Sequence, residues 1–249
     1  MLRKRLVTVL TLNDGVLFRT KRFEPDYRYT LNFVDAWSVD EIVLLDISRG
    51  PASDRSAFLK VVETFASRCF VPLAAGGGVR SVADFQRLLG AGADKVVINT
   101  AAVENSGVVT EAARRLGAQC VVVSIDARRR AEGGYEVHTH HGTRPTGLGP
   151  AEWAQRAQEL GAGEIFVTSI DRDGSLEGYE TALNRDVVEA VAVPVLVCGG
   201  AGQWQHFVDA FVDTGAAAVC TTNVYHFTET SIRSAKRYLR DAGIAVREE

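Results

Sequence analysis

The sequence is poor in cysteine, contains no basic tract and has no long apolar run near its start. Its four cysteines, Cys69, Cys120, Cys198 and Cys220, lie far apart, which excludes the close cysteine pairs of zinc sites and redox motifs. We therefore expect reduced, mostly buried thiols. The apolar run after the first charged residues is too short for a signal peptide or a membrane span, so we expect a cytoplasmic protein.

The charge balance and the lack of linkers limit the partners and the domain organisation. A formal net charge of −3 argues against nucleic acid or an anionic membrane as the main partner, whereas a small anionic ligand is compatible with it. No Pro- or Ser-rich linker divides the chain, so we expect one domain over residues 1–249. The hydrophobic fraction of 46% is enough for a large buried core.

Two segments about half the chain apart resemble each other. Residues 71–78 read VPLAAGGG, and residues 193–200 read VPVLVCGG. Each segment is followed by a helical pattern, a second apolar run and a polar turn. A unit that occurs once in each half of the chain predicts a duplicated half-barrel.

Short apolar runs without alternation recur along the whole chain and are typical of buried parallel strands. They alternate with segments that carry apolar residues at three- and four-residue steps, as helices do. The pattern predicts a (β/α)8 barrel, also called a TIM barrel. The predicted strands are 6–11, 42–47, 71–75, 95–98, 120–126, 164–169, 193–197 and 218–222, and the predicted helices are 55–67, 82–89, 108–116, 151–160, 186–191 and 204–212.

Two connections, residues 12–30 and 127–149, are longer than a barrel requires. Both follow the carboxyl ends of predicted strands, where barrels place their active sites, so they are either lids or tolerated surface insertions. Residues 135–140 alternate enough to form a hairpin. The histidines within residues 138–141 lack a third ligand of fixed geometry, and we predict a solvated hairpin and no metal site.

The glycine turns of the two repeats are candidate phosphate sites. Backbone N–H groups at such turns, together with short polar side chains, bind anions at the start of the following helix. One glycine turn alone is as compatible with tight backbone geometry as with binding. Two related turns favour a ligand with a phosphate at each end. One candidate site contains Gly77, Gly78, Asn99 and Thr100, and the other contains Gly200, Gly202, Thr222 and Asn223.

Carboxylates at the carboxyl ends of predicted strands are the candidate acids and bases: Asp46, Asp126, Asp171 and Asp173. Asp126 ends the fifth predicted strand. The repeat predicts a counterpart at the end of the first strand, and Thr11 stands there.

Charged residues begin four of the predicted strands at the opposite end of the barrel: Arg5, Glu41, Lys95 and Glu164. Two cations and two anions in these positions form either a solvated rim or a ring that closes the barrel floor. Spacing alone leaves both interpretations open.

Several segments resemble the cyclase subunit of imidazole glycerol phosphate synthase, in register over essentially the whole chain. The resemblance implies that ammonia from a glutaminase partner enters the barrel floor, crosses the interior and meets a bisphosphorylated substrate at the top. It implies no cofactor. The segments that carry the resemblance are residues 2–5, 14–15, 40–47, 93–105 and 163–174.

The resemblance also assigns roles to individual residues. It implies an ammonia gate at the four charged strand starts, partner docking near Asp94 and catalysis at Asp126. Asn223 stands where the family usually has serine. The implied contacts with one phosphate are Gly77, Gly78, Asn99 and Thr100, those with the other are Gly174, Gly200, Gly202 and Asn223, and the rest of the substrate site is Arg19, Asp46, Thr168, Asp173 and Thr222.

The chain departs from the family at Thr11, which occupies the position of the second catalytic aspartate. A hydroxyl without a useful pKa cannot replace a carboxylate, and loss of a positioned acid or base costs ~10² to 10⁴ in rate. Arg19 also stands where the family has lysine. Residues 37–41 and 45–49 resemble a paralogue group associated with surface-glycan amidation, which also lacks this aspartate.

Three functions are therefore compatible with the sequence. The first is an ammonia-accepting barrel that serves the conversion of a sugar's acetamido group to an acetamidino group, on a phosphorylated or nucleotide-sugar acceptor. The second is a histidine-pathway cyclase in which Asp46 or Asp173 replaces the missing aspartate. The third is an inert scaffold that activates a glutaminase. The threonine at position 11, where the family has an aspartate, favours the first function over the second.

Overall fold

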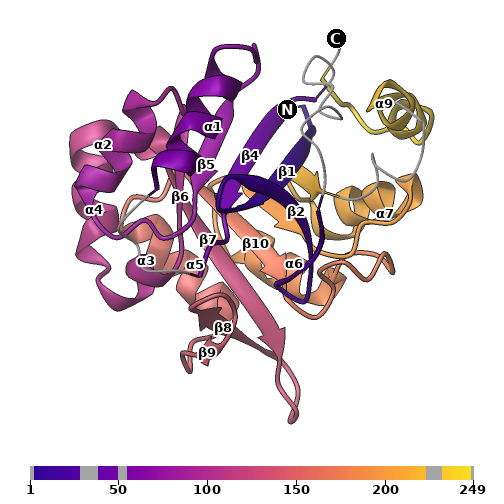
Figure 1. The fold of residues 1–249 in the computed structure, drawn as a ribbon. Helices are drawn as coiled ribbons and strands as arrows, with labels where there is room; N and C mark the ends of the chain where they lie inside the picture. The colour runs from indigo at the N-terminus through magenta and orange to yellow at the C-terminus, as the bar shows by residue number, and fades with distance from the viewer. Residues whose placement is uncertain (1–2, 29–38, 50–54, 223–231, 248–249) are drawn as a thin grey trace.

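The computed structural model describes residues 3–28, 39–49, 55–222 and 232–247, and within them eight parallel strands close into a barrel (Figure 1). The strands follow one another around the barrel in chain order, and β7 pairs with β10 to join the two halves. The predicted TIM barrel is therefore confirmed. The barrel strands are β1 (Arg5–Asn13), β4 (Glu41–Asp46), β5 (Leu73–Gly76), β6 (Lys95–Ile98), β7 (Val121–Arg129), β10 (Glu164–Ser169), β11 (Val195–Cys198) and β12 (Ala218–Thr221).

Helices surround the barrel and bury one apolar face each. In α2, Val82, Phe85 and Leu88 face the strands, and Ser81 with Asp84 forms a capping box at the first turn. The helix predicted at residues 186–191 begins earlier, at Thr181, and α3 and α9 were not predicted. The helices are α1 (Ser56–Ala66), α2 (Val82–Gly90), α3 (Thr100–Glu104), α4 (Gly107–Leu116), α5 (Pro150–Glu159), α6 (Thr181–Ala190), α7 (Trp204–Thr214) and α9 (Ile232–Asp241), with a 3₁₀ turn at Ala118–Cys120.

The barrel strands are buried on both faces, which explains why their sequences do not alternate. Along β1, Leu6 and Leu10 pack outward against the helices, whereas Val7 and Val9 point into the barrel. The interior side chains form a separate apolar cluster inside the strands. The interior of the barrel, which we call the apolar lumen, is therefore lined by apolar side chains.

Two antiparallel hairpins extend the barrel at the carboxyl ends of its strands (Figure 1). β1 continues past the predicted end at Thr11 and pairs with β2 (Val16–Lys21), which pairs with β3 (Glu24–Arg28). β7 similarly pairs with β8 (Tyr135–Thr139), which pairs with β9 (Arg144–Pro145). The predicted hairpin near residues 135–140 is therefore confirmed, but it is not solvated throughout, because His138 and Thr139 are buried. Each hairpin follows the first strand of its half, β1 or β7, so the hairpins are also related by the repeat.

Across the parts of the chain that the structure describes, none of the helices is both long and apolar enough to cross a membrane.

Candidate active site

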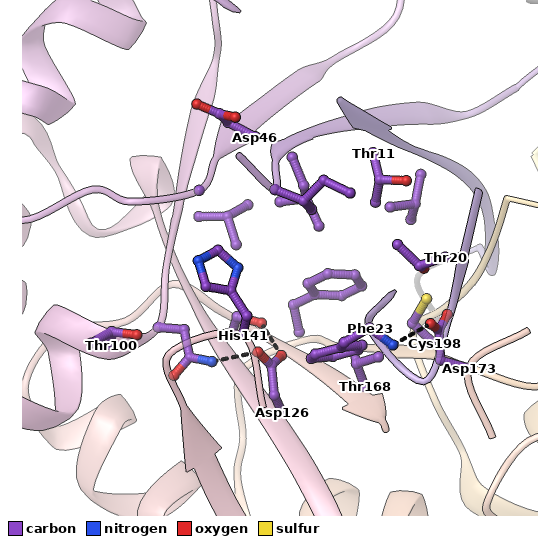
Figure 2. A pocket seen from close by; sticks show the side chains of 18 of the residues that line it. Thr11, Thr20, Phe23, Asp46, Thr100, Asp126, His141, Thr168, Asp173 and Cys198 are labelled. Atoms are coloured by element: carbon purple, nitrogen blue, oxygen red, sulfur yellow. Dashed lines mark hydrogen bonds between the residues drawn. The ribbon is translucent and has the colours of Figure 1, made fainter. Parts of the chain in front are cut away.

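A cavity of about 560 Å³ opens at the carboxyl ends of the barrel strands, and Figure 2 shows side chains that line it. Its wall combines residues from both halves of the repeat. It brings together most of the residues predicted for the substrate site. Those that line it are Thr11, Asp46, Gly77, Gly78, Asn99, Thr100, Asp126, Thr168, Asp173, Gly174, Gly200 and Thr222.

Asp126 is the central ionisable group of this cavity. Ser124 Oγ donates to Asp126 Oδ1 over 3.0 Å, and Asn99 Nδ2 donates to Asp126 Oδ2 over 2.5 Å. Burial raises the pKa of Asp126 to about 6; these two hydrogen bonds oppose the rise, and the charge of Asp173 adds to it. The carboxyl group is therefore held in place and changes protonation near neutral pH, as an acid or base must.

Asp173 lies after β10 and holds the β2–β3 hairpin against the cavity. Its Oδ2 accepts the backbone N–H of Phe23 over 3.0 Å, and its backbone carbonyl accepts that of Arg22 over 3.2 Å. Burial raises the pKa of Asp173, although the bonds from Phe23 and the Thr20 hydroxyl and the charge of Arg19 act in the opposite direction. A second carboxyl group with a raised pKa thus shares the cavity with Asp126.

Thr11 lies across the cavity from Asp126, because β1 and β7 are four strands apart in an eight-stranded barrel (Figure 2). Its hydroxyl donates to the backbone carbonyl of Phe18 in β2. This bond fastens the β2–β3 hairpin to the end of β1. The Thr11 side chain therefore has a structural contact and no ionisable group.

The first glycine turn combines unusual backbone with polar side chains. Gly77 and Gly78 have φ of +97° and +56°, a region that favours glycine. Asn99 Oδ1 is buried without a hydrogen-bond partner among the described residues, and Thr100 Oγ1 accepts the His140 N–H over 3.1 Å. The unpaired amide oxygen marks a place where a ligand's donor could bind.

The second glycine turn lies beside the end of β12. Gly200 has φ of +105°, and Gly200, Gly174 and Thr222 line the cavity. Gly202 is not part of the wall, and its N–H donates to His206 Nδ1 over 3.1 Å. Asn223 lies outside the described residues.

Two other predicted substrate contacts differ in their placement. Asp46 lines the cavity, and its Oδ1 accepts the Ser48 hydroxyl over 2.6 Å. Arg19 forms an ion pair with Asp26 and is not part of the cavity wall. The structure thus brings Asp46, but not Arg19, to the cavity.

The four charged residues predicted at the barrel floor meet in one closed ring. Arg5 Nη1 lies 2.7 Å from Glu41 and 2.9 Å from Glu164, and Lys95 Nζ lies 2.9 Å from Glu41 and 2.7 Å from Glu164. Burial opposes the charge of Arg5, but the two glutamates outweigh it and raise its pKa. Each residue is the first of its strand, so the ring spans the floor.

An apolar lumen separates this ring from the cavity. Val7, Val43 and Val122 belong to the interior cluster, and Val9 and Phe166 belong both to that cluster and to the cavity wall. The order from floor to mouth is therefore a charged ring, an apolar lumen and a polar cavity with two carboxyl groups of raised pKa.

Residues 7–231 match the family described as Histidine biosynthesis protein. The chain belongs to that family. The match covers both halves of the repeat and the barrel strands, so the family relationship and the fold agree.

Asp94 directly precedes Lys95 and therefore lies on the face of the barrel where the charged ring is. It is exposed, and its Oδ2 accepts the Leu73 N–H over 2.8 Å. Phe70, which lies two residues before Pro72, is 82% exposed. A shallow pocket is lined by both Phe70 and Asp94. The docking role of Asp94 stays a prediction. Phe70 was not predicted to lie here, because nothing in a single sequence marks an aromatic side chain as exposed.

Several cavity residues of this family member were not predicted as site residues. His141, Cys198 and Cys220 line the cavity. Burial raises the pKa of Cys198 to about 12, and burial lowers the pKa of His141, with the charges of Arg49 and His140 acting in the same direction. The thiols are thus kept protonated, and His141 is kept neutral. The described residues contain no group of three or more His, Cys, Asp or Glu suited to a metal ion.

Proposed function

We propose that the chain is the ammonia-accepting barrel subunit of a glutamine amidotransferase and delivers ammonia to a phosphorylated acceptor. The closed ring of Arg5, Glu41, Lys95 and Glu164 is the observation that carries this proposal. Such buried ion pairs cost desolvation energy that apolar packing would avoid, which argues for a role beyond stability. We assign the ring the role of an ammonia gate.

The lumen above the ring supports the same proposal. Neutral ammonia can enter an apolar lumen, whereas the ammonium ion would lose its hydration there at high cost. Val9 and Phe166 connect the lumen to the cavity in which Asp126 lies. With a pKa of about 6, Asp126 is suited to exchange a proton with the incoming nitrogen or with the acceptor.

The face around the ring is the proposed docking site for the glutaminase. Exposed Phe70 and Asp94 lie together on it and provide an apolar and a charged contact. Aromatic side chains are enriched at the centre of protein interfaces. Docking there would deliver ammonia directly to the gate.

For the acceptor, we propose a sugar or nucleotide sugar whose acetamido group becomes an acetamidino group after a separate enzyme has activated the amide. Thr11 supports this choice, because its hydroxyl is bound to the Phe18 carbonyl and offers no second acid or base. Ammonia would add to the carbon of the activated amide, and the carbon–oxygen bond would break as the amide oxygen leaves with its activating group. A single carboxyl group, Asp126, can take the proton that the nitrogen loses. Cyclisation in the family mechanism uses two.

The second candidate is the histidine-pathway cyclase reaction, with Asp173 in place of the missing aspartate. The raised pKa of Asp173 and its place in the same cavity favour this candidate. Asp126 and Asp173 would then act as an acid and base pair, although from neighbouring strands rather than from opposite sides of the barrel.

One assay separates the two candidates. The purified protein is given ammonium salt and the histidine-pathway substrate, and product formation is followed. Turnover at an ordinary enzyme rate, roughly 1 s⁻¹ or more, would refute the sugar proposal, and its loss in Asp173→Asn would identify the pair. Absence of turnover would refute the cyclase.

The gate is tested with Lys95→Met in complex with the glutaminase subunit. We expect glutamine-dependent turnover to change more than ammonia-dependent turnover, because only the first route crosses the floor from the partner. Lys60→Met, a change on the exposed face of α1, is the control for the lost charge. Equal effects on both routes would contradict the role as a gate.

A further inference from the structure

The two glycine turns differ in what lies beside them. A Cβ atom on Gly200 would overlap the backbone carbonyl of Gly178, whereas a Cβ atom on Gly78 would overlap the guanidinium of Arg55. Gly178 and Arg55 lie in corresponding segments, since each lies between the second strand of its half and the following helix. The same space is therefore filled by backbone in one half and by a cation in the other.

Arg55 approaches the turn from behind. Its Nη1 donates to the backbone carbonyl of Gly77. Gly77 and Gly78 belong to the cavity wall, whereas Arg55 does not. The peptide bond between the glycines is trans, so its N–H points opposite to its carbonyl. The Gly78 N–H therefore points away from the Arg55 Nη1 atom that binds the carbonyl.

The Gly78 N–H is available to a ligand. Among the described residues, no acceptor forms a hydrogen bond with it. A bond from a cation to the carbonyl of a peptide polarises that peptide and makes its N–H a stronger donor. Arg55 thus fixes the direction of this donor and increases its strength.

Among the residues that the structure describes, none gives the second turn an equivalent arrangement. Arg172 has its Cβ 3.3 Å from the place where a Cβ of Gly200 would lie. Its guanidinium, however, is paired with Glu177 over 3.3 Å and Glu180 over 3.5 Å. The charge of this arginine is balanced locally by carboxylates, and it does not strengthen the turn as Arg55 does.

We propose that Arg55 is a positioning residue that makes the first glycine turn the stronger of two phosphate sites. The proposal rests on the phosphorylated acceptor of the proposed function. A ligand with two phosphates would bind in one orientation, with its more highly charged end at Gly77 and Gly78. The two halves of the repeat would then distinguish the two phosphate groups of the ligand.

The test is an NMR titration of the full chain with inorganic phosphate, with the amides of Gly78 and Gly200 as separate reporters. Arg55→Gln keeps a donor and removes the charge, and Arg55→Lys keeps the charge and removes the planar fork. We expect Arg55→Gln to weaken phosphate binding at Gly78 by about fivefold to tenfold, since a charge-assisted hydrogen bond is about twice as strong as a neutral one. Binding at Gly200 should be unchanged, and Arg55→Lys should restore part of the loss.

Arg115→Gln is the matched control, because Arg115 is an exposed arginine on α4 paired with Glu111. It should alter neither reporter. Arg55→Gln should also reduce the salt dependence of phosphate binding at Gly78, which a loss of rigidity alone would not do.

Equal weakening at both glycines, or no weakening at either, would overturn the role of Arg55 while leaving phosphate binding intact. If neither glycine of the unmodified protein responds to phosphate, the proposed phosphate sites fail, and the role of Arg55 fails with them. If Arg55→Gln does not fold, phosphate binding by Arg55→Lys is compared with that of the unmodified protein. Unchanged phosphate binding at Gly78 in Arg55→Lys would then refute the proposal.

Discussion

Replacing Asp126 with asparagine should make the protein more stable at high pH, although it removes the proposed catalytic group. The pKa of Asp126 is raised from 3.8 to about 6 by burial. The folded state therefore binds the proton more tightly than the unfolded state, and the stability contributed by protonation is lost as the pH rises through about 6. Above that pH the ionised carboxylate lowers the free energy of unfolding.

The magnitude follows from the difference between the two pKa values. With a difference of about two pKa units, ionisation of Asp126 lowers the free energy of unfolding by about 3 kcal/mol at pH 8 and by about 1 kcal/mol at pH 4.5. Asparagine has one side-chain oxygen, so it retains one of the hydrogen bonds from Ser124 and Asn99 and loses the other. That loss costs about 1 kcal/mol. The expected gain is about 2 kcal/mol at pH 8 and about zero at pH 4.5.

Urea unfolding of Asp126→Asn at the two pH values measures this difference. Asp213→Asn, which changes an exposed carboxylate on α7, should show no comparable pH dependence. Turnover of the natural acceptor should fall by ~10² to 10⁴. An equal change in the free energy of unfolding at both pH values would refute the reasoning, because the carboxyl group would then titrate alike in the folded and unfolded states.

Two further predictions concern contacts that hold the barrel together. Thr11→Val removes the hydroxyl bonded to the Phe18 carbonyl; urea unfolding should show a loss of about 1 kcal/mol, and turnover should be nearly unchanged. A large loss of turnover at unchanged stability would contradict the structural role. Lys236→Met breaks a buried ion pair with Asp40, whose side chains are only 3% and 4% exposed. The free energy of unfolding should fall by about 3 to 5 kcal/mol, and adding Asp40→Asn should recover part of it. No recovery in the double variant would argue against an uncompensated charge as the cause.

The strands were predictable because their signal is local. Each of the eight runs is apolar enough to be buried on both faces, and the glycine turn after β5 recurs after β11 in the sequence itself. The places of Asp126 and Lys95 on their strands were predictable for the same reason, whereas their roles stay predictions. Lys95 begins β6, and Asp126 lies in β7 where that strand leaves the barrel and enters the hairpin with β8.

The missed features depend on tertiary contacts. The helix α9 has few apolar residues, and its Lys236 is buried only because Asp40 lies opposite. No sequence motif marks Arg55, which directly precedes α1. Its proposed role depends on its contact with the carbonyl of Gly77, which lies 22 residues later in the sequence. The cavity thiols Cys198 and Cys220 were predicted as buried, but their position on the cavity wall depends on how β11 and β12 lie together.

The charged ring and the cavity depend on the two halves of the repeat in different ways. The charged ring takes Arg5, Glu41 and Lys95 from the first half and Glu164 from the second, so a change in either half would break it. The cavity tolerates differences between its halves, because each strand end contributes a separate side chain. In β1, the hydroxyl of Thr11 binds the Phe18 carbonyl and secures the β2–β3 hairpin. The fold, the charged ring and the glycine turns therefore do not depend on a carboxylate at residue 11, and under the proposed function the side chains at the mouth would determine which acceptor the barrel serves.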